Sequence, residues 1–366
     1  MQIQLIFNES LDSVAATDVS HYVIEPSLNI VSAAISDSDL TIVELTISTA
    51  IDSNVVYTII ATGISDCSGN VATTSDSIQF ALPSPAISGE ILLNEILFNP
   101  KFDGYDYVEI YNNSDKVFDL KDWQLANADE YDSLTSLNTI IEDQYLFFPE
   151  QYLVLTENAT AIKQQYYAAN PDWFIEMNLP SLNDDEGTII ILNTAGERID
   201  QLHYSESWQF PLIDEPDGVA LERISFDAPT QDALNWHSAA STVGYGTPSY
   251  ENSQHVEPLA QNEISIEPKV FSPDQDGYND VVAINYQFSQ PGFIGNVKIF
   301  NSRGTQIRDL VHNALLPSSG TFIWDGITDA NDRAPIGIYI ILTEIFDLSG
   351  SVKHYKHVCV VGEKKR

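Results

Sequence analysis

Residues 107–114 read "YVEIYNNS", and this stretch indicates the fold class of the chain. Tyr107, Glu109 and Tyr111 alternate with a valine and an isoleucine, so the two sets lie on opposite faces of an extended strand. The asparagines and the serine that follow are residues that favour turns. The stretch therefore predicts a short β-strand that ends in a tight turn.

The same pattern recurs along the whole chain as short runs rich in Val, Ile, Thr, Tyr and Phe, separated by Asp, Asn, Gly, Ser and Pro. Further examples are "LTIVELTIS" (40–48), "VVYTIIATGI" (55–64), "QYLVLTE" (151–157), "GTIIILNTAGERIDQLHY" (187–204), "GNVKIFNSRG" (295–304) and "GIYIILTEIF" (337–346). Helical periodicity is scarce, and its best candidate is "ATAIKQQYYAAN" (159–170). Strands without intervening helices predict an all-β chain of sandwiches in series.

Two polar, proline-containing stretches divide the chain into three parts. They are "ALPSPAISGE" (81–90) and "ENSQHVEPLAQNE" (251–263), and both are typical of linkers. A chain of 366 residues with 43% hydrophobic content can bury several cores. We therefore expect three Ig-like β-sandwich domains in tandem, over residues 1–85, 90–253 and 264–366, with at most one or two short helices.

The charge balance excludes one class of partner. Lys and Arg number 16 against 53 for Asp and Glu, which gives a formal net charge of -37. Such a surface repels a phosphate backbone, so we expect no nucleic-acid binding. No apolar run is long enough to predict a membrane span. The two cysteines, Cys67 and Cys359, exclude a disulfide framework, although one bridge stays open; we expect two free and mostly buried thiols.

The first part contains "IFNESLDSVAATDVSHYVIE" (6–25) and "YTIIATGISDCSGNVA" (57–72). This cadence resembles the bacterial Ig-like domains of surface-layer and cell-wall proteins. The resemblance implies a spacer or adhesive module without catalysis.

The second part opens with "ILLNEILFNPKFDGYDYVEIYNNSDKVFDLKDWQLAN" (91–127). It resembles the lamin-tail domain, an Ig-like sandwich, and the resemblance extends over residues 90 to about 253. In bacterial proteins this domain is usually an accessory unit joined to nucleases, phosphatases or other surface domains. The large side chains of Trp123, Trp208 and Trp236 are expected to anchor the core of the sandwich.

The third part contains "FSPDQDGYNDVVAINYQF" (271–288) and "WDGITDANDRAPIGIYI" (324–340). These motifs resemble C-terminal Ig-like domains of the hook-cap family and of the gliding-motility, type IX secretion family. The resemblance implies a bacterial protein that is extracellular or displayed on the outer-membrane exterior. The partner would be a cell-surface or outer-membrane protein, or an extracellular glycan.

Within the third part, "FSPDQDGYND" concentrates oxygen ligands in one turn. Asp274, Asp276, Asn279 and Asp280 surround Gly277, and calcium prefers carboxylate and carbonyl oxygens around a sharp bend. The alternative is an acidic turn whose side chains cap the backbone and are solvated. The sequence thus predicts a calcium site at these four residues, with the capped turn as the competing interpretation.

Catalytic motifs are missing from the sequence. It contains no "GxSxG", "GxxxxGK[ST]" or "HExxH" pattern, and the seven histidines are scattered. We therefore expect no enzyme, but a spacer, adhesion or carrier region of a secreted or surface protein. Two alternatives stay open: an accessory region of an extracellular hydrolase whose catalytic domain precedes residue 1, or a subunit of an outer-membrane assembly.

Overall fold

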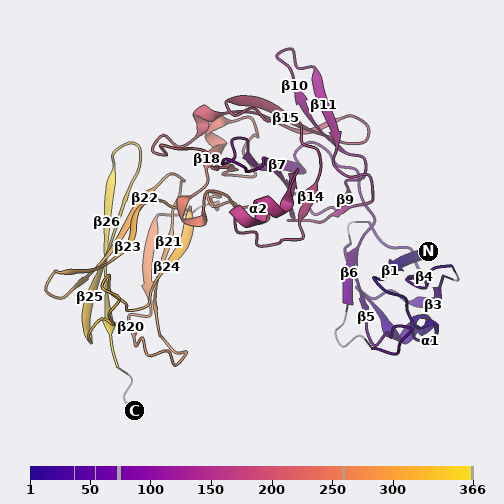
Figure 1. The fold of residues 1–366 in the computed structure, drawn as a ribbon, viewed down its shortest axis with the longest axis horizontal. Coiled ribbons are helices and arrows are strands. Elements are labelled where there is room, and N and C mark those ends of the chain that lie inside the picture. The colour runs from indigo at the N-terminus through magenta and orange to yellow at the C-terminus, as the bar shows by residue number, and fades with distance from the viewer. Residues whose placement is uncertain (37, 54, 72–75, 259, 364–366) are drawn as a thin grey trace. The chain divides into compact units, whose positions relative to one another are not determined.

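The computed structural model describes residues 1–36, 38–53, 55–71, 76–258 and 260–363 (Figure 1). The chain divides into two compact units. The first comprises Met1–Ala86, Ser114–Lys121 and Asp143–Pro149, and the second comprises Ile87–Asn113, Asp122–Glu142 and Glu150–Arg366. Strands dominate both units, and the described residues contain two short α-helices, which confirms the all-β expectation.

The first unit contains two three-stranded sheets, ordered β1-β4-β3 and β2-β5-β6, and a short β9-β12 pair. Its elements are β1 (Gln2–Ile6), α1 (Ser13–Thr17), β2 (Tyr22–Glu25), β3 (Ile30–Ile35), β4 (Ile42–Ile47), β5 (Tyr57–Ala61), β6 (Asp76–Phe80), β9 (Phe118–Asp119) and β12 (Leu146–Phe147). Ile24, Val43, Leu45 and Ile59 are buried in one core to which both larger sheets contribute. The alternating runs of the sequence thus supply the inward faces of a small sandwich.

The second unit begins with a six-stranded sheet, ordered β14-β13-β8-β7-β17-β18, and a four-stranded sheet, ordered β11-β10-β15-β16. The strands are β7 (Ile91–Leu97), β8 (Tyr107–Asn112), β10 (Gln124–Ala128), β11 (Leu134–Thr139), β13 (Tyr152–Thr156), β14 (Phe174–Glu176), β15 (Glu186–Leu192), β16 (Arg198–Ser205), β17 (Leu221–Arg223) and β18 (Trp236–Ser238). Strand β8 is the predicted "YVEIYN", and it is buried along its entire length. This burial on both faces places β8 inside the fold rather than at a half-exposed surface.

Aromatic side chains fill the space beside these sheets. Phe98, which follows β7, stacks on Tyr204 of β16 with ring centroids 4.6 Å apart. Trp123 and Trp236 are buried as expected, at 5% and 3% exposure. Trp208 is only partly buried, because it lies in a 3-10 turn (Glu206–Trp208) outside the strands, so the expectation that it anchors the core is wrong.

The predicted helix is present but shorter than expected. Helix α2 covers Ala159–Gln165, and the side chain of Asn158 caps it by accepting the N–H of Ala161 at 2.9 Å. Tyr166 adopts an extended conformation, and its buried hydroxyl donates to the carbonyl of Gly218 at 2.8 Å. This tertiary contact ends the helix before residue 170.

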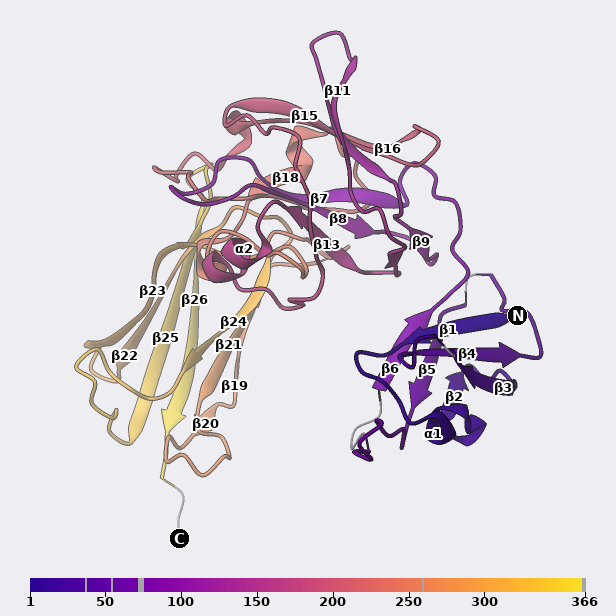
Figure 2. The same cartoon turned by 45° about the vertical axis from the view of Figure 1, so that its right-hand side comes forward.

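The rest of the second unit is a sandwich of a three-stranded sheet, β19-β21-β24, and a five-stranded sheet, β20-β26-β25-β22-β23. Figure 2 shows the long strands β22, β25 and β26 side by side. The strands are β19 (Glu263–Glu267), β20 (Val270–Phe271), β21 (Val282–Gln287), β22 (Ile294–Asn301), β23 (Gln306–Leu315), β24 (Ser319–Trp324), β25 (Gly337–Phe346) and β26 (Val352–Val361). Trp324 lies at the centre of its core, with Phe271 and Tyr339 packed edge-on at 5.3 and 5.2 Å.

Three residues near the start of the second expected linker are not exposed. Asn252, Ser253 and Gln254 are buried, at 4%, 8% and 0% exposure. The carbonyl of Ser253 accepts the N–H of Ser318 at 2.8 Å, and the side chain of Gln254 donates to the carbonyl of Leu316 at 3.2 Å. This part of the chain therefore ties the C-terminal sandwich to the sheets that precede it.

Both thiols are free, as expected. Cys359 is buried in the core of the C-terminal sandwich, whereas Cys67 is exposed, so the expectation of burial holds for Cys359 and is wrong for Cys67. No helix among the described residues is long and apolar enough to cross a membrane.

Candidate functional site

Three glutamates lie side by side in the middle of the six-stranded sheet. In the strand register Glu95 of β7 is the cross-strand partner of Glu109 of β8 on one side and of Glu222 of β17 on the other. Cross-strand partners share one face of a sheet, so the three carboxyl groups form a row. All three residues are buried, with at most 1% exposure. We call them the glutamate row.

Residues 247–254, which we call the strap, cover the glutamate row. The backbone N–H of Thr247 donates to Glu95 at 2.9 Å, and the backbone N–H of Ser249 donates to Glu109 at 2.6 Å. Glu222 accepts the hydroxyl of Ser253 at 2.7 Å and the N–H of Gln254 at 2.8 Å, and Glu109 also accepts the side-chain amide of Asn94 at 2.8 Å. The carboxyl oxygens are thus used to hold the chain's own backbone.

Burial changes the protonation of the row. It raises the pKa of Glu109 to about 8 and raises the pKa of Glu222. The pKa of Glu95 is well above its ordinary value because the group is desolvated and because the negative charges of Glu222 and Glu109 oppose its ionisation. Protons are therefore retained in the row at neutral pH.

The hydroxyl of Thr247 lies between two carboxyl groups of the row. Its Oγ1 lies 2.7 Å from Glu222 Oε1 and 3.3 Å from Glu95 Oε2. A hydroxyl carries one hydrogen, so when it donates to the nearer Glu222 the longer contact is a hydrogen bond only if Glu95 carries a proton and donates it. This assignment agrees with the raised pKa of Glu95.

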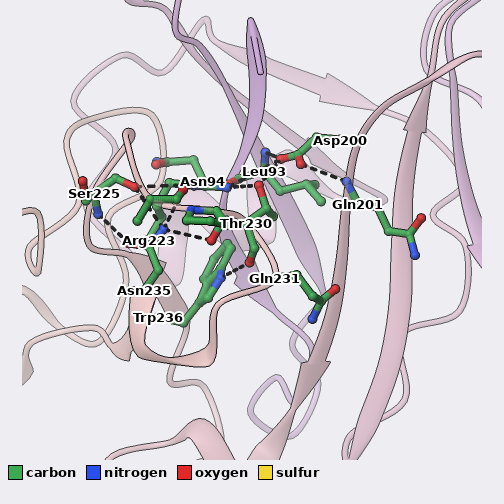
Figure 3. A network of polar contacts seen from close by, with 12 residues as sticks. Leu93, Asn94, Asp200, Gln201, Arg223, Ser225, Thr230, Gln231, Asn235 and Trp236 are labelled. Atoms are coloured by element: carbon green, nitrogen blue, oxygen red, sulfur yellow. Dashed lines mark hydrogen bonds and ion pairs between the residues drawn. The ribbon is translucent and has the colours of Figure 1, made fainter. Parts of the chain in front are cut away.

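The residue next to Glu222 belongs to a second buried network (Figure 3). The guanidinium group of Arg223 donates to the carbonyls of Leu93 at 2.8 Å and Ala228 at 3.0 Å and to the hydroxyl of Thr230, and it lies 3.6 Å from the carboxylate of Asp200. Its charge also lies 5.5 Å from the ring centroid of Trp236. Burial lowers the pKa of Arg223 to about 10. Arg223 thus organises the loop after β17, while Glu222 faces the strap.

A small cavity lies at the start of β8. Its volume is about 300 Å³, and its lining residues are Asp106, Glu157, Leu179, Pro180, Ser181 and Leu182. Burial raises the pKa of Asp106 to about 7, with further contributions from the negative charges of Asp184 and Glu157. This cavity could not be predicted from the sequence, because its lining comes from separate loops.

The structure brings together the three aspartates of the predicted calcium turn. One carboxylate oxygen from each of Asp274, Asp276 and Asp280 lies within 4.8 Å of the others. Asp280 also accepts the N–H groups of Gln275 at 2.6 Å and Gly277 at 2.7 Å, as the competing interpretation of a capped turn requires.

Asn279 adopts a left-handed conformation, with φ at 52°, and its carbonyl accepts the N–H of Ser272 at 2.8 Å. In the structure, Asn279 therefore contributes to the turn through its backbone. Phe271 is buried and anchors the start of the turn to the core. Calcium binding by Asp274, Asp276, Asn279 and Asp280 stays a prediction.

Comparison with known proteins identifies one part of the chain. Residues 84–206 match the model of the Lamin Tail Domain family. This confirms the lamin-tail resemblance over those residues, while its extension to about residue 253 and the resemblances of the first and third parts stay predictions. No curated protein matches the chain.

Several solved structures show limited similarity. A DUF4876 family protein from Bacteroides thetaiotaomicron is 9% identical, with 69% of this chain and 99% of that chain covered and a TM-score of 0.29. Dimeric latent PorU from Porphyromonas gingivalis is 10% identical, with 91% and 26% covered and a TM-score of 0.21. The N-terminal part of the bacterial S-layer protein SbsC is 14% identical, with 42% and 36% covered and a TM-score of 0.21. This chain thus corresponds to only part of the PorU and SbsC chains.

Proposed function

We propose that the chain is a non-catalytic array of Ig-like β-sandwich modules, acting as a spacer, adhesion or carrier region of a secreted or cell-surface bacterial protein. Residues 264–366 act in this proposal as a secretion or anchoring domain of the type IX kind. The partner is a cell-surface or outer-membrane protein, or an extracellular glycan. The lamin-tail match over residues 84–206 supports the accessory, Ig-like character of the middle part.

The non-catalytic part of the proposal rests on one observation: the glutamate row is buried and hydrogen-bonds to the strap. A general acid or base must reach the proton of a substrate. Glu95, Glu109 and Glu222 have raised pKa values, as catalytic acids often do, but they are buried under the strap and hydrogen-bond to it. Their chemistry is used to hold the chain together, as a load-carrying module requires.

The location is tested by labelling intact cells of the native bacterium with an antibody against this chain. We expect the antibody to detect the chain on the cell exterior or in the medium, and to detect it inside the cells when residues 264–366 are deleted. A cytoplasmic marker protein, probed in the same samples, controls for lysis. Detection of the undeleted chain only after lysis contradicts the proposal.

A further inference from the structure

A second group of potential metal ligands begins within the strap, at Glu251, and continues toward β19 with His255 and Glu257. One ligand atom from each of Glu251, His255 and Glu257 lies within 4.8 Å of the others. These three residues are not conspicuous in the sequence, because the seven histidines are scattered and carboxylates are abundant in this chain. The three side chains come together because the fold fixes the conformation of the short segment that carries them.

His255 is held in place from several sides. Its ring stacks on Phe226 with centroids 4.7 Å apart and an interplanar angle of 24°. Its backbone N–H donates to the carbonyl of Asn252 at 3.0 Å, and its carbonyl accepts the hydroxyl of Ser318. The imidazole is therefore positioned before any ligand binds, which lowers the entropic cost of binding.

The three groups do not satisfy one another. Nδ1 of His255 is shielded from solvent and has no hydrogen-bond partner among the described residues. In the described part of the chain, neither Glu251 nor Glu257 forms an ion pair with a lysine, an arginine or His255. Two carboxylates and an imidazole whose Nδ1 has no hydrogen-bond partner among the described residues form, at this spacing, an arrangement that a bound cation would neutralise.

We propose that Glu251, His255 and Glu257 bind one divalent transition-metal ion of the zinc class, with water completing the coordination. Zinc accepts imidazole nitrogen and carboxylate oxygen at about 2.0–2.2 Å, so small movements of the two exposed glutamates complete the shell. The imidazole ligand distinguishes this site from the aspartate turn, because calcium binds through oxygen ligands.

The position of the site gives the metal a structural role. Ser318 of the C-terminal sandwich donates to the carbonyl of His255, and the N–H of Val256 donates to the carbonyl of Ile224 at 3.0 Å. A metal held by Glu251 and Glu257 fixes the two ends of this short segment. It therefore stiffens the connection from the six-stranded sheet to the C-terminal sandwich.

The test is a calorimetric titration of the whole chain with Zn²⁺ at neutral pH, with millimolar Ca²⁺ present to occupy sites that prefer hard cations. We expect one Zn²⁺ per chain, and a loss of affinity of about tenfold or more in Glu257→Gln and in His255→Phe. The phenylalanine keeps an aromatic ring against Phe226 while removing the nitrogen ligand. Glu257 is exposed, so Glu257→Gln is decisive even where His255→Phe impairs folding.

The matched control is His354→Ala. His354 and Glu344 form a surface pair at 3.2 Å, which offers an imidazole and only one carboxylate. We expect the Zn²⁺ affinity of this variant to equal that of the native chain. The proposal is overturned by an absence of Zn²⁺ binding, by unchanged affinity in Glu257→Gln, or by an equal loss in His354→Ala.

Discussion

The protonation of Glu95 predicts an unusual response to a conservative substitution. In Glu95→Gln the amide oxygen can accept the N–H of Thr247, and the amide N–H₂ can donate to the Thr247 hydroxyl, which lies 3.3 Å from Glu95 Oε2. The variant therefore reproduces the hydrogen bonds of the protonated side chain. It differs from the native residue in that it cannot ionise.

The raised pKa of Glu95 determines how the free energy of unfolding changes with pH. The folded-state pKa of Glu95 lies well above the ordinary value of 4.5, so the folded state holds a proton that the unfolded state has lost. Stability supplied by this proton is complete below pH 4.5 and is lost as the pH rises through the folded-state pKa. The loss is about 1.4 kcal/mol per pH unit for one proton.

The same linkage gives a scale for the neighbouring group. The pKa of Glu109 rises from 4.5 to about 8, so ionising it costs the folded state on the order of 5 kcal/mol. Glu95→Gln removes the contribution of Glu95 and leaves that of Glu109 in place. The difference in unfolding free energy between the variant and the native chain should thus grow by about 1.4 kcal/mol per pH unit above pH 5.

The assay is urea unfolding followed by tryptophan fluorescence at a series of pH values between about 5 and 8. Taking the difference between variant and native chain cancels the titration of distant groups. Glu222→Gln is a comparison at the lowest pH: Glu222 accepts at both oxygens, so an amide N–H₂ loses an accepted hydrogen bond, and we expect it to destabilise the fold by about 1–3 kcal/mol. A pH-independent difference for Glu95→Gln, or one that falls with rising pH, would refute the protonated assignment.

Three further predictions concern the rest of the chain. Millimolar calcium should raise the thermal unfolding midpoint of the chain, through a site with a dissociation constant on the order of 10⁻⁴ M. Asp276→Ala should abolish this shift, whereas the control Asp332→Ala should preserve it. Equal midpoints with calcium and with chelator would support the capped turn without a metal. Arg223→Met should lower the free energy of unfolding in urea by about 3–5 kcal/mol, because it leaves Asp200 buried without its cation. The control Arg198→Met breaks an exposed pair with Asp132 and should lower it by at most about 1 kcal/mol. Similar losses in the two variants would contradict the role given to the buried pair. Limited proteolysis should cut within residues 81–90 and after Val256, and early cleavage between Asn252 and His255 would contradict the burial of the strap.

Local pattern was sufficient to predict the strands. "YVEIYNNS" predicted the strand that the structure places at Tyr107–Asn112, since alternation and turn residues act within a few positions. The aspartate turn was equally local, and Asp274, Asp276 and Asp280 do lie together. The end of helix α2 was not local, because the buried contacts of Tyr166 decide it.

The glutamate row could not be predicted in the same way. Glu109 and Glu222 are far apart in sequence, and only the register of β8, β7 and β17 places both beside Glu95. A signal was nevertheless present, because each glutamate interrupts an apolar strand: "NEIL", "VEIY" and "ALER". A charged residue inside such a run indicates burial with hydrogen-bond partners, since the alternative is an unpaired group in the core.

The strap joins the middle and C-terminal parts of the second unit through hydrogen bonds to both parts. Ser253 donates its hydroxyl to Glu222, while its carbonyl accepts the N–H of Ser318. Gln254 also bonds in both directions: its backbone N–H donates to Glu222, and its side chain donates to the carbonyl of Leu316. Each residue thus hydrogen-bonds to the glutamate row on one side and to the C-terminal sandwich on the other. We therefore expect a change in the hydrogen bonds of the row to affect this junction as well, because both depend on the same short segment.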